Sequence, residues 1–289
     1  MATLEGKRPV SVSEVLRYAL LTTLMVFFLF PIYWMIATSF KAPEDILTRP
    51  PKWLFTPVLS NYVYAFKEAN FALFIRNTLL VSVVSTMLVV GLGALASYSF
   101  ARYNVGKGHL MFFILTTRMM PAIAVIIPYF LIFRTLGSTT LGRALALGLD
   151  RPGALIVAYT MFNLPFAIWL MHSFFQDIPR ELEDTARLDG YTRFKVLRKV
   201  VLPLAAPAIA VTAIFCLLFS WNEFLFAYLL TREAAKTITV GVAGFWTQRG
   251  ILWGPLAAAA TICVVPMLVF ALILQRHIAR GLTFGAVKG

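Results

Sequence analysis

Residues 77–101 read NTLLVSVVSTMLVVGLGALASYSFA, a run without a single charged side chain. An α-helix rises about 1.5 Å per residue, and about 20 mostly apolar residues are needed to cross the hydrocarbon core of a bilayer. The run is long enough to do so, and it contains no ionised group whose burial in lipid would be costly. It therefore predicts a transmembrane helix.

Five further segments have the same apolar character. They are residues 18–40, 110–133, 153–176, 200–231 and 254–275. The first follows basic residues, but its apolar run is too long for a signal peptide, so we expect a retained helix. The expected fold class is all-α: a polytopic membrane protein with six transmembrane helices in a single domain, residues 1–289.

The composition agrees with a membrane protein. Of the 289 residues 60% are hydrophobic and 13% charged, and the mean hydropathy is +0.79, which leaves too little charge for a soluble surface. The net charge of +13 comes from scattered basic residues, so we expect no nucleic-acid partner. Cys216 and Cys263 lie in separate apolar runs, and the three histidines lack ligand spacing, so we expect no disulfide and no metal site.

The most informative polar segment separates the fourth and fifth runs. Residues 178–203 read IPRELEDTARLDGYTRFKVLRKVVLP. Pro179 suits the first turn of a short helix, the acidic residues after it favour a helix N-terminus, and Gly190 suits a C-terminal cap. A second amphipathic helix is expected from about Thr192 to the membrane surface, where Pro203 opens the fifth span.

Basic residues set the expected orientation. They are dense between Arg180 and Lys199, and loops rich in lysine and arginine stay in the cytoplasm. We therefore expect residues 178–200 to form a cytoplasmic loop, and both chain termini to lie on the same side. A solvated surface helix with ordinary charge mixing is the plainer interpretation of this loop.

The spacing within this loop resembles the EAA signature of the permeases of ABC importers. That signature is Glu-Ala-Ala, three residues, Gly, nine residues, an aliphatic residue, one residue and Leu-Pro. The matching positions are Asp184, Thr185, Ala186, Gly190, Val200, Leu202 and Pro203. Every gap matches, but Asp184 replaces the glutamate and Thr185 replaces the first alanine.

Three other segments extend the resemblance over most of the chain. NLPFAIW at 163–169, SWNEF at 220–224 and GLTFGAVKG at 281–289 are similar to the carbohydrate branch of this family, the maltose-type inner-membrane permeases. The resemblance implies the type I ABC importer permease fold. It also implies import of a carbohydrate or polyol across the cytoplasmic (inner) membrane of a bacterium or archaeon.

In this family the loop is a coupling helix that docks into a cleft on the ATPase, with its acid facing a basic residue. Either Asp184 or Glu183 could take that part. The coupling residues implied are Glu183, Asp184, Thr185, Ala186, Asp189, Gly190, Leu202 and Pro203. The resemblance also implies that a cytoplasmic tail, 276–289, contacts the ATPase through Thr283, Gly285 and Lys288; a disordered tail is the alternative.

The energy for transport is expected to come from another subunit. No Gly-x4-Gly-Lys-Ser/Thr motif occurs, and the Gly-Lys-Gly at 106–108 lacks the upstream glycine of a phosphate-binding loop. We expect no enzyme activity and no cofactor on this chain, with ATP and Mg on the partner ATPase. The resemblance implies several partners: a second permease that is a different chain, an ABC ATPase dimer, an extracytoplasmic solute-binding protein and membrane lipid.

The solute pathway is less well marked. Arg118 and Glu223 are the charged residues within the spans, and such residues normally face protein or water rather than lipid. Asn163, Trp221 and Asn222 add the amide and aromatic groups that bind sugars. A structural hydrogen-bond network between helices would explain the same residues.

The sequence leaves another cargo and two other protein classes to consider. A sugar phosphate cargo would give Arg118 an anionic partner. A secondary transporter would carry its own coupling ions and often an inverted repeat, which we do not find. A membrane enzyme would need an assembled nucleophile, base or metal cluster, and the sequence offers none. The outer loop, 41–72, keeps several prolines and aromatics, and we expect it to help seat the binding protein.

Overall fold

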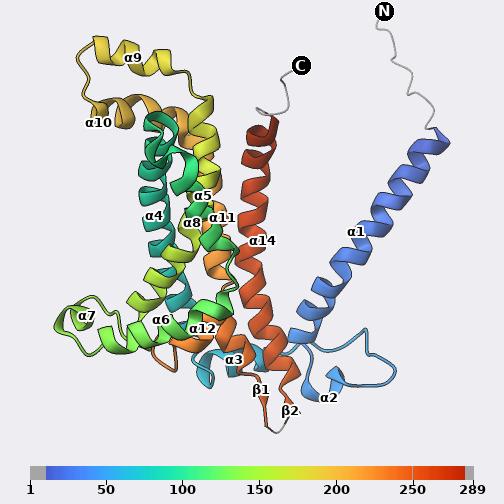
Figure 1. Ribbon diagram of the computed structural model, residues 1–289. Coiled ribbons are helices and arrows are strands. Elements are labelled where there is room, and N and C mark those ends of the chain that lie inside the picture. The colour runs from blue at the N-terminus through green and yellow to red at the C-terminus, as the bar shows by residue number, and fades with distance from the viewer. Residues whose placement is uncertain (1–10, 249, 284–289) are drawn as a thin grey trace, which may run out of the picture. The chain divides into compact units, whose positions relative to one another are not determined.

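The computed structural model describes residues 11–248 and 250–283, and its regular structure is almost entirely helical (Figure 1). Within the described residues, five helices are long and apolar enough to cross a membrane, and a bent helix pair makes a sixth candidate. The long helices are α1 (Val12–Ser39), α4 (Phe71–Tyr103), α8 (Pro152–Asp177), α11 (Leu202–Trp221) and α14 (Trp253–Thr283). The all-α class is confirmed.

Several of these helices extend beyond the expected spans; α4, for example, begins at Phe71 instead of residue 77. α1 begins six residues earlier than residue 18, because Ser11 and Glu14 form a capping box that fixes its first turn. α14 continues from Trp253 to Thr283, so part of the segment expected to be a tail is helical.

The third expected span is not one straight helix. It is divided into α5 (His109–Met119) and α6 (Ala122–Leu136), which are bent by 93° relative to each other. Pro121 explains the break, because a proline has no backbone N–H to donate and disfavours helical geometry in the residue before it. Met120 is accordingly extended, with φ −66° and ψ 132°.

The fifth expected span, 200–231, is also interrupted. α11 ends at Trp221, and a short helix, α12 (Leu225–Leu230), starts after Glu223. The Glu223 carboxylate accepts hydrogen bonds from the backbone N–H groups of Phe226 and Ala227 at 2.9 and 3.1 Å. It thus caps a new helix, so the expectation that Glu223 lies inside a continuous span was wrong.

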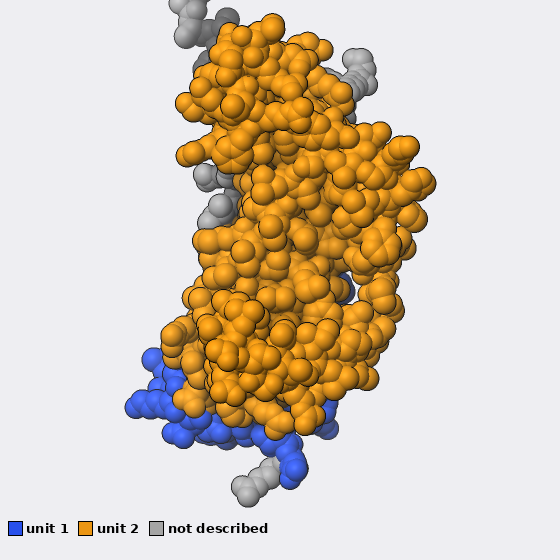
Figure 2. All heavy atoms as spheres, turned by 60° about the vertical axis from the view of Figure 1, so that its left-hand side comes forward, with its two compact units in different colours: residues 1–68, 245–261 blue, residues 69–244, 262–289 orange. Residues whose placement is uncertain are grey.

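The chain forms two compact units, which Figure 2 shows in different colours. The first contains the described residues up to Glu68 and those from Phe245 to Thr261. Its elements are α1, α2 (Pro43–Ile46), α3 (Ser60–Lys67), the start of α14, and the antiparallel strands β1 (Trp246–Thr247) and β2 (Gly250–Ile251).

Within this first unit, Asn61 of α3 fixes the chain that leaves α1. Its side-chain amide donates to the carbonyl oxygens of Ser39 and Lys41 at 3.0 and 2.9 Å. The buried Lys41 ammonium lies 4.1 Å from the centroid of the Trp34 ring, so a cation–π contact stabilises its charge there.

The second unit contains the described residues 69–244 and 262–283. Its remaining elements are η1 (Val105–Gly108), α7 (Thr140–Ala144), α9 (Arg180–Leu188), α10 (Arg193–Val196), η2 (Leu197–Val201) and α13 (Ile238–Ala243). α4, α8 and α11 run side by side and form its frame (Figure 1).

Small residues let α4 and α8 approach closely. Gly93, Ser97 and Ala101 follow one another at four-residue intervals on α4. A Cβ atom at Gly93 would lie 2.7 Å from the Met171 side chain, and the Ser97 hydroxyl donates to the Ile168 carbonyl at 2.9 Å. Small residues and interhelical hydrogen bonds of this kind drive helix association in membranes, where lipid removes the hydrophobic driving force.

A carboxylate organises the loops at the end of this unit opposite α9. Asp150, between α7 and α8, accepts hydrogen bonds from the backbone N–H groups of residues 232–235 at 2.9 to 3.2 Å. Burial raises the pKa of the Asp150 carboxyl, but the four backbone donors outweigh that effect and hold its pKa below the usual value. The ionised form therefore stabilises the folded loops.

We predict that Gly93→Leu lowers the thermal unfolding midpoint of the purified protein, because overpacking a tight helix contact costs about 1–3 kcal/mol. Gly91→Leu is the matched control, since a Cβ at Gly91 meets nothing within 4 Å. Equal midpoints for the two variants would contradict the close packing of α4 on α8.

We predict that Asp150→Asn destabilises the protein at neutral pH by about 1.5 kcal/mol, the lower end of what hydrogen bonds to a charged group contribute, because the carboxylate is only partly buried. Because the folded pKa is lowered, this stability is present above the unfolded pKa of about 3.9 and is lost as pH falls through the folded pKa. Thermal melts between neutral and acidic pH should therefore converge for the variant and the parent. Asp177→Asn, at an exposed acid, is the control, and a constant difference between parent and Asp150→Asn at all pH values would refute the assignment.

Candidate functional site

The polar segment between α8 and α11 begins with α9, and its ends have clear local causes. Pro179 precedes the first turn, where Glu181 and Glu183 favour the positive end of the helix dipole. Gly190, with φ +82°, ends the helix: its N–H donates to the Arg187 carbonyl, and the next N–H donates to the Ala186 carbonyl. This is the Schellman arrangement, so the predicted glycine cap is confirmed.

The second helix of the segment differs from the expectation. α10 starts after Thr192, whose hydroxyl accepts from the Lys195 N–H at 3.4 Å. It then continues through the π-helical turn η2 directly into α11. Leu202 and Pro203 therefore occupy the first turn of α11 in one continuous helical path, rather than opening a separate span.

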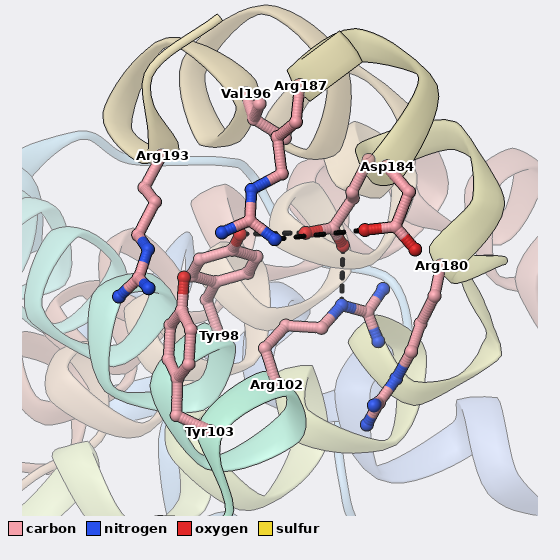
Figure 3. Close-up of a pocket in the computed structure, with 9 residues that line it drawn as sticks. Tyr98, Arg102, Tyr103, Arg180, Asp184, Arg187, Arg193 and Val196 are labelled. Carbon is pink, nitrogen blue, oxygen red and sulfur yellow. Dashed lines mark hydrogen bonds and ion pairs between the residues drawn. The ribbon is translucent and has the colours of Figure 1, made fainter.

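One face of α9 is bound to the end of α4. Glu183 is 7% exposed, and its carboxylate accepts from the Arg102 Nε and from the Tyr98 hydroxyl, the latter at 2.8 Å (Figure 3). Arg102 also donates through Nη2 to the Ile178 carbonyl at 2.8 Å. Ala186, three residues after Glu183, is buried on the same face.

The opposite face of α9 is open. The Asp184 side chain is 70% exposed and lies 3.8 Å from the Arg187 guanidinium, and Leu188, one turn further, is 89% exposed. Thr185 and Asp189 are exposed as well. Because residues four apart share one face of a helix, Asp184 and Leu188 form one outward stripe.

A cavity of about 140 Å³ lies between α9, α10 and the end of α4 (Figure 3). Arginines dominate its lining, and Glu183 is neutralised by Arg102. The full lining is Tyr98, Arg102, Tyr103, Arg180, Glu183, Asp184, Arg187, Arg193 and Val196. Sequence reasoning missed Tyr98 and Arg102, because nothing in the loop spacing indicates partners about eighty positions earlier.

The expected pathway residues are held mainly by hydrogen bonds within the chain. Asn163 donates to the Ser220 hydroxyl at 3.1 Å, and Ser85 reaches the same hydroxyl at 3.3 Å. The Trp221 indole N–H donates to the Cys263 carbonyl at 3.1 Å, and Asn222 donates to the Leu218 carbonyl at 2.9 Å. With Glu223 capping α12, the structural interpretation of these residues gains support.

Arg118 differs from the others. Its guanidinium lies 3.8 Å from the centroid of the Phe162 ring and donates to the Phe162 carbonyl at 2.9 Å. Among the residues that the structure describes, no carboxylate forms an ion pair with it. Arg118 and Glu223 thus have different partners and do not form an ion pair with each other.

The tail residues can be placed only in part. Thr283 is the last residue of α14. Gly285 and Lys288 lie outside the described residues.

Comparison with known proteins identifies the family of this chain. Residues 89–284 match the family model of the binding-protein-dependent transport system inner membrane component. The chain belongs to this family.

Curated relatives cover nearly the whole permease. The chain is 36% identical to the trehalose transport system permease protein SugB of Mycobacterium tuberculosis, over 94% of this chain and 97% of that protein. It is 33% identical to the trehalose/maltose transport system permease protein MalG of Thermococcus litoralis, over 90% and 92%. It is 32% identical to the sulfoquinovosyl glycerol transport system permease protein SmoH of Agrobacterium fabrum, over 100% and 99%.

A solved structure has the same fold. A bacterial ABC transporter involved in the import of the acidic polysaccharide alginate aligns with a TM-score of 0.74 at 21% identity, covering 93% of this chain and 99% of that chain. The permease therefore has the type I ABC importer fold and is a multi-pass inner-membrane transport subunit. ATP hydrolysis in such importers belongs to separate ATPase subunits.

Proposed function

We propose that this permease forms half of the pathway by which a carbohydrate or polyol enters a bacterial or archaeal cell, and that α9 is its contact with the ATPase. The observation that carries the proposal is the division of α9 into two faces. Glu183 is bound inside the protein, whereas the Asp184 side chain and Leu188 are largely exposed, and Asp184 has only a surface ion pair with Arg187. Of the two acids that the sequence left open, Asp184 is the one available to a partner.

The exposed apolar groups on this segment support a docking surface. Leu188 and Phe194 are 89% and 68% exposed although they lie on charged helices, α9 and α10. An apolar stripe beside a charge on an otherwise polar surface is typical of a protein interface. The partner proposed is the ATPase, which would bind ATP and Mg. The basic residues around α9 support a cytoplasmic location for this side and for both termini.

Other partners follow from the family. We propose a second permease subunit that completes the pathway, an ABC ATPase dimer and an extracytoplasmic solute-binding protein. The outer loop, 41–72, is proposed to seat the binding protein, since Trp53 and Leu54 are exposed on it. Thr283, Gly285 and Lys288 are proposed to contact the ATPase from the end of α14.

The class of cargo is argued from relatives. The names of SugB, MalG and SmoH refer to trehalose, maltose and a sulfonated glycoside, so a glycoside is the proposed cargo. A sugar phosphate is the second candidate, because the Arg118 guanidinium has no acidic partner among the described residues and lies within a span, where an unpaired charge is costly. Asn163, Trp221, Asn222 and Glu223 are proposed to shape the pathway rather than to bind the cargo directly.

We predict that Asp184→Asn weakens association with the ATPase about tenfold or more, because removing one partner of an interfacial charge pair leaves the other charge unpaired. The measurement is co-purification of the ATPase from membranes in which all subunits are expressed, together with ATPase stimulation by the loaded binding protein. Glu181→Gln, at an exposed acid on the same helix, is the control. Unchanged association of Asp184→Asn would refute the proposed contact.

A further inference from the structure

α9 is joined to its neighbours in sequence by two short links. On one side, residues 178 and 179 separate it from α8, and on the other, residues 189–192 separate it from α10. The second link contains Gly190 at φ +82°, in the region that glycine enters most readily. Links of this kind can bend, so the orientation of α9 depends on side-chain contacts.

The Arg102 side chain supplies those contacts from α4, a helix that is remote in sequence but adjacent in space. Its Nε donates to the Glu183 carboxylate on α9, and its Nη2 donates to the Ile178 carbonyl in the preceding link. Tyr98, one turn earlier on α4, donates to the other Glu183 oxygen at 2.8 Å. One guanidinium therefore holds both the helix and the link that precedes it.

The ion pair is well shielded from water. The side chains of Arg102 and Glu183 are 6% and 10% exposed. Breaking such a pair by removing one partner is strongly unfavourable, because it leaves an uncompensated buried charge. Separating α9 from α4 therefore costs more free energy than breaking a surface ion pair would.

Apolar packing continues the attachment. Tyr98 and Ala101 of α4, Phe175 of α8 and Ala186 of α9 belong to one buried cluster, together with Val196 of α10. The Tyr98 and Phe175 rings meet edge to face at 6.1 Å. α9 is therefore anchored to the core of the second unit by a polar clasp beside an apolar contact.

We propose that Arg102 and Tyr98 are positioning residues for energy coupling. They hold α9 rigidly against the end of α4, so that a displacement of α9 by the ATPase enters α4 instead of being absorbed by bending at Pro179 and Gly190. Neither residue contacts the cargo or the nucleotide in this role. The inference rests on the proposed function, because it requires that the ATPase moves α9.

The two donor groups of Arg102, Nε and Nη2, distinguish a positioning role from simple charge balance. A guanidinium is a planar fork that serves two acceptors at once, whereas a lysine ammonium is a compact point charge on a flexible stem. Arg102→Lys keeps the charge beside Glu183 but cannot reproduce the simultaneous hold on Ile178. A residue that only balanced the buried charge would tolerate lysine.

The test uses the complete transporter in proteoliposomes, with its ATPase, second permease and binding protein. We expect Arg102→Lys to raise the number of ATP molecules hydrolysed per solute imported about tenfold, which corresponds to about 1.4 kcal/mol of lost coupling. The ATPase should still co-purify, since the outer stripe of α9 is intact. Arg198→Lys, at an exposed cation on η2, is the matched control and should keep the parent ratio.

A second measurement covers the case in which Arg102→Lys fails to insert. Tyr98→Phe removes only the hydroxyl and preserves the ring packing, and it should raise the same ratio severalfold. An unchanged ratio in Arg102→Lys, or in Tyr98→Phe where the first variant does not insert, would overturn the proposal. Additive effects of Arg102→Gln and Glu183→Gln on this ratio would also overturn the proposal, because substitutions of two residues in direct contact should not have additive effects.

Failure of the proposed function has a different signature. If α9 were not the ATPase contact, Asp184→Asn would leave association unchanged. If only the positioning role were wrong, Asp184→Asn would still weaken association while Arg102→Lys kept the parent ratio.

Discussion

The arrangement of α9 and of the chain around it depends on the buried carboxylate of Glu183. Arg102 and Tyr98 satisfy it from α4, and Ala186 packs beside it. Once that face of α9 is fixed, helical geometry leaves Leu188 and most of the Asp184 side chain exposed. The proposed docking surface thus depends on an internal ion pair that would not itself contact the partner.

The long helices of the second unit are closely connected to one another and to this segment. α4 lies against α8 through Gly93 and Ser97, and α10 passes without a break into α11. The three long helices that frame this unit therefore all lead toward α9 and α10. The interruptions occur elsewhere, at Pro121 and at Glu223, where helix geometry cannot continue or where a carboxylate starts a new helix.

Much of this could be predicted from the sequence, because the signals involved are local. Apolar length located the spans, and Gly190 marked the end of α9. The bend at Pro121 and the break at Glu223 were not located, because both lie within segments that are apolar on average and hydropathy does not report backbone geometry. The capping by Glu223 needs a turn that the pattern of apolar residues does not specify.

Only the loop segment of the candidate site could be predicted from the sequence; its partners on α4 could not. The spacing from Asp184 to Pro203 identified the segment, but it could not choose between Asp184 and Glu183, since adjacent positions on a helix differ in direction by about 100° and their burial depends on what packs nearby. Arg102 is remote in sequence and follows an apolar run like many interfacial arginines. Its partnership with Glu183 is a tertiary contact, and only the fold reveals it.

Cysteine cross-linking along α9 tests the central claim most directly. In a variant with Cys216 and Cys263 replaced by serine, single cysteines would be placed at positions 181–189 and oxidised against cysteines in the ATPase cleft. The account predicts strong cross-links at positions 184 and 188 and weak ones at 183 and 186. Strong cross-linking at 183, or equal yields at all positions, would contradict it.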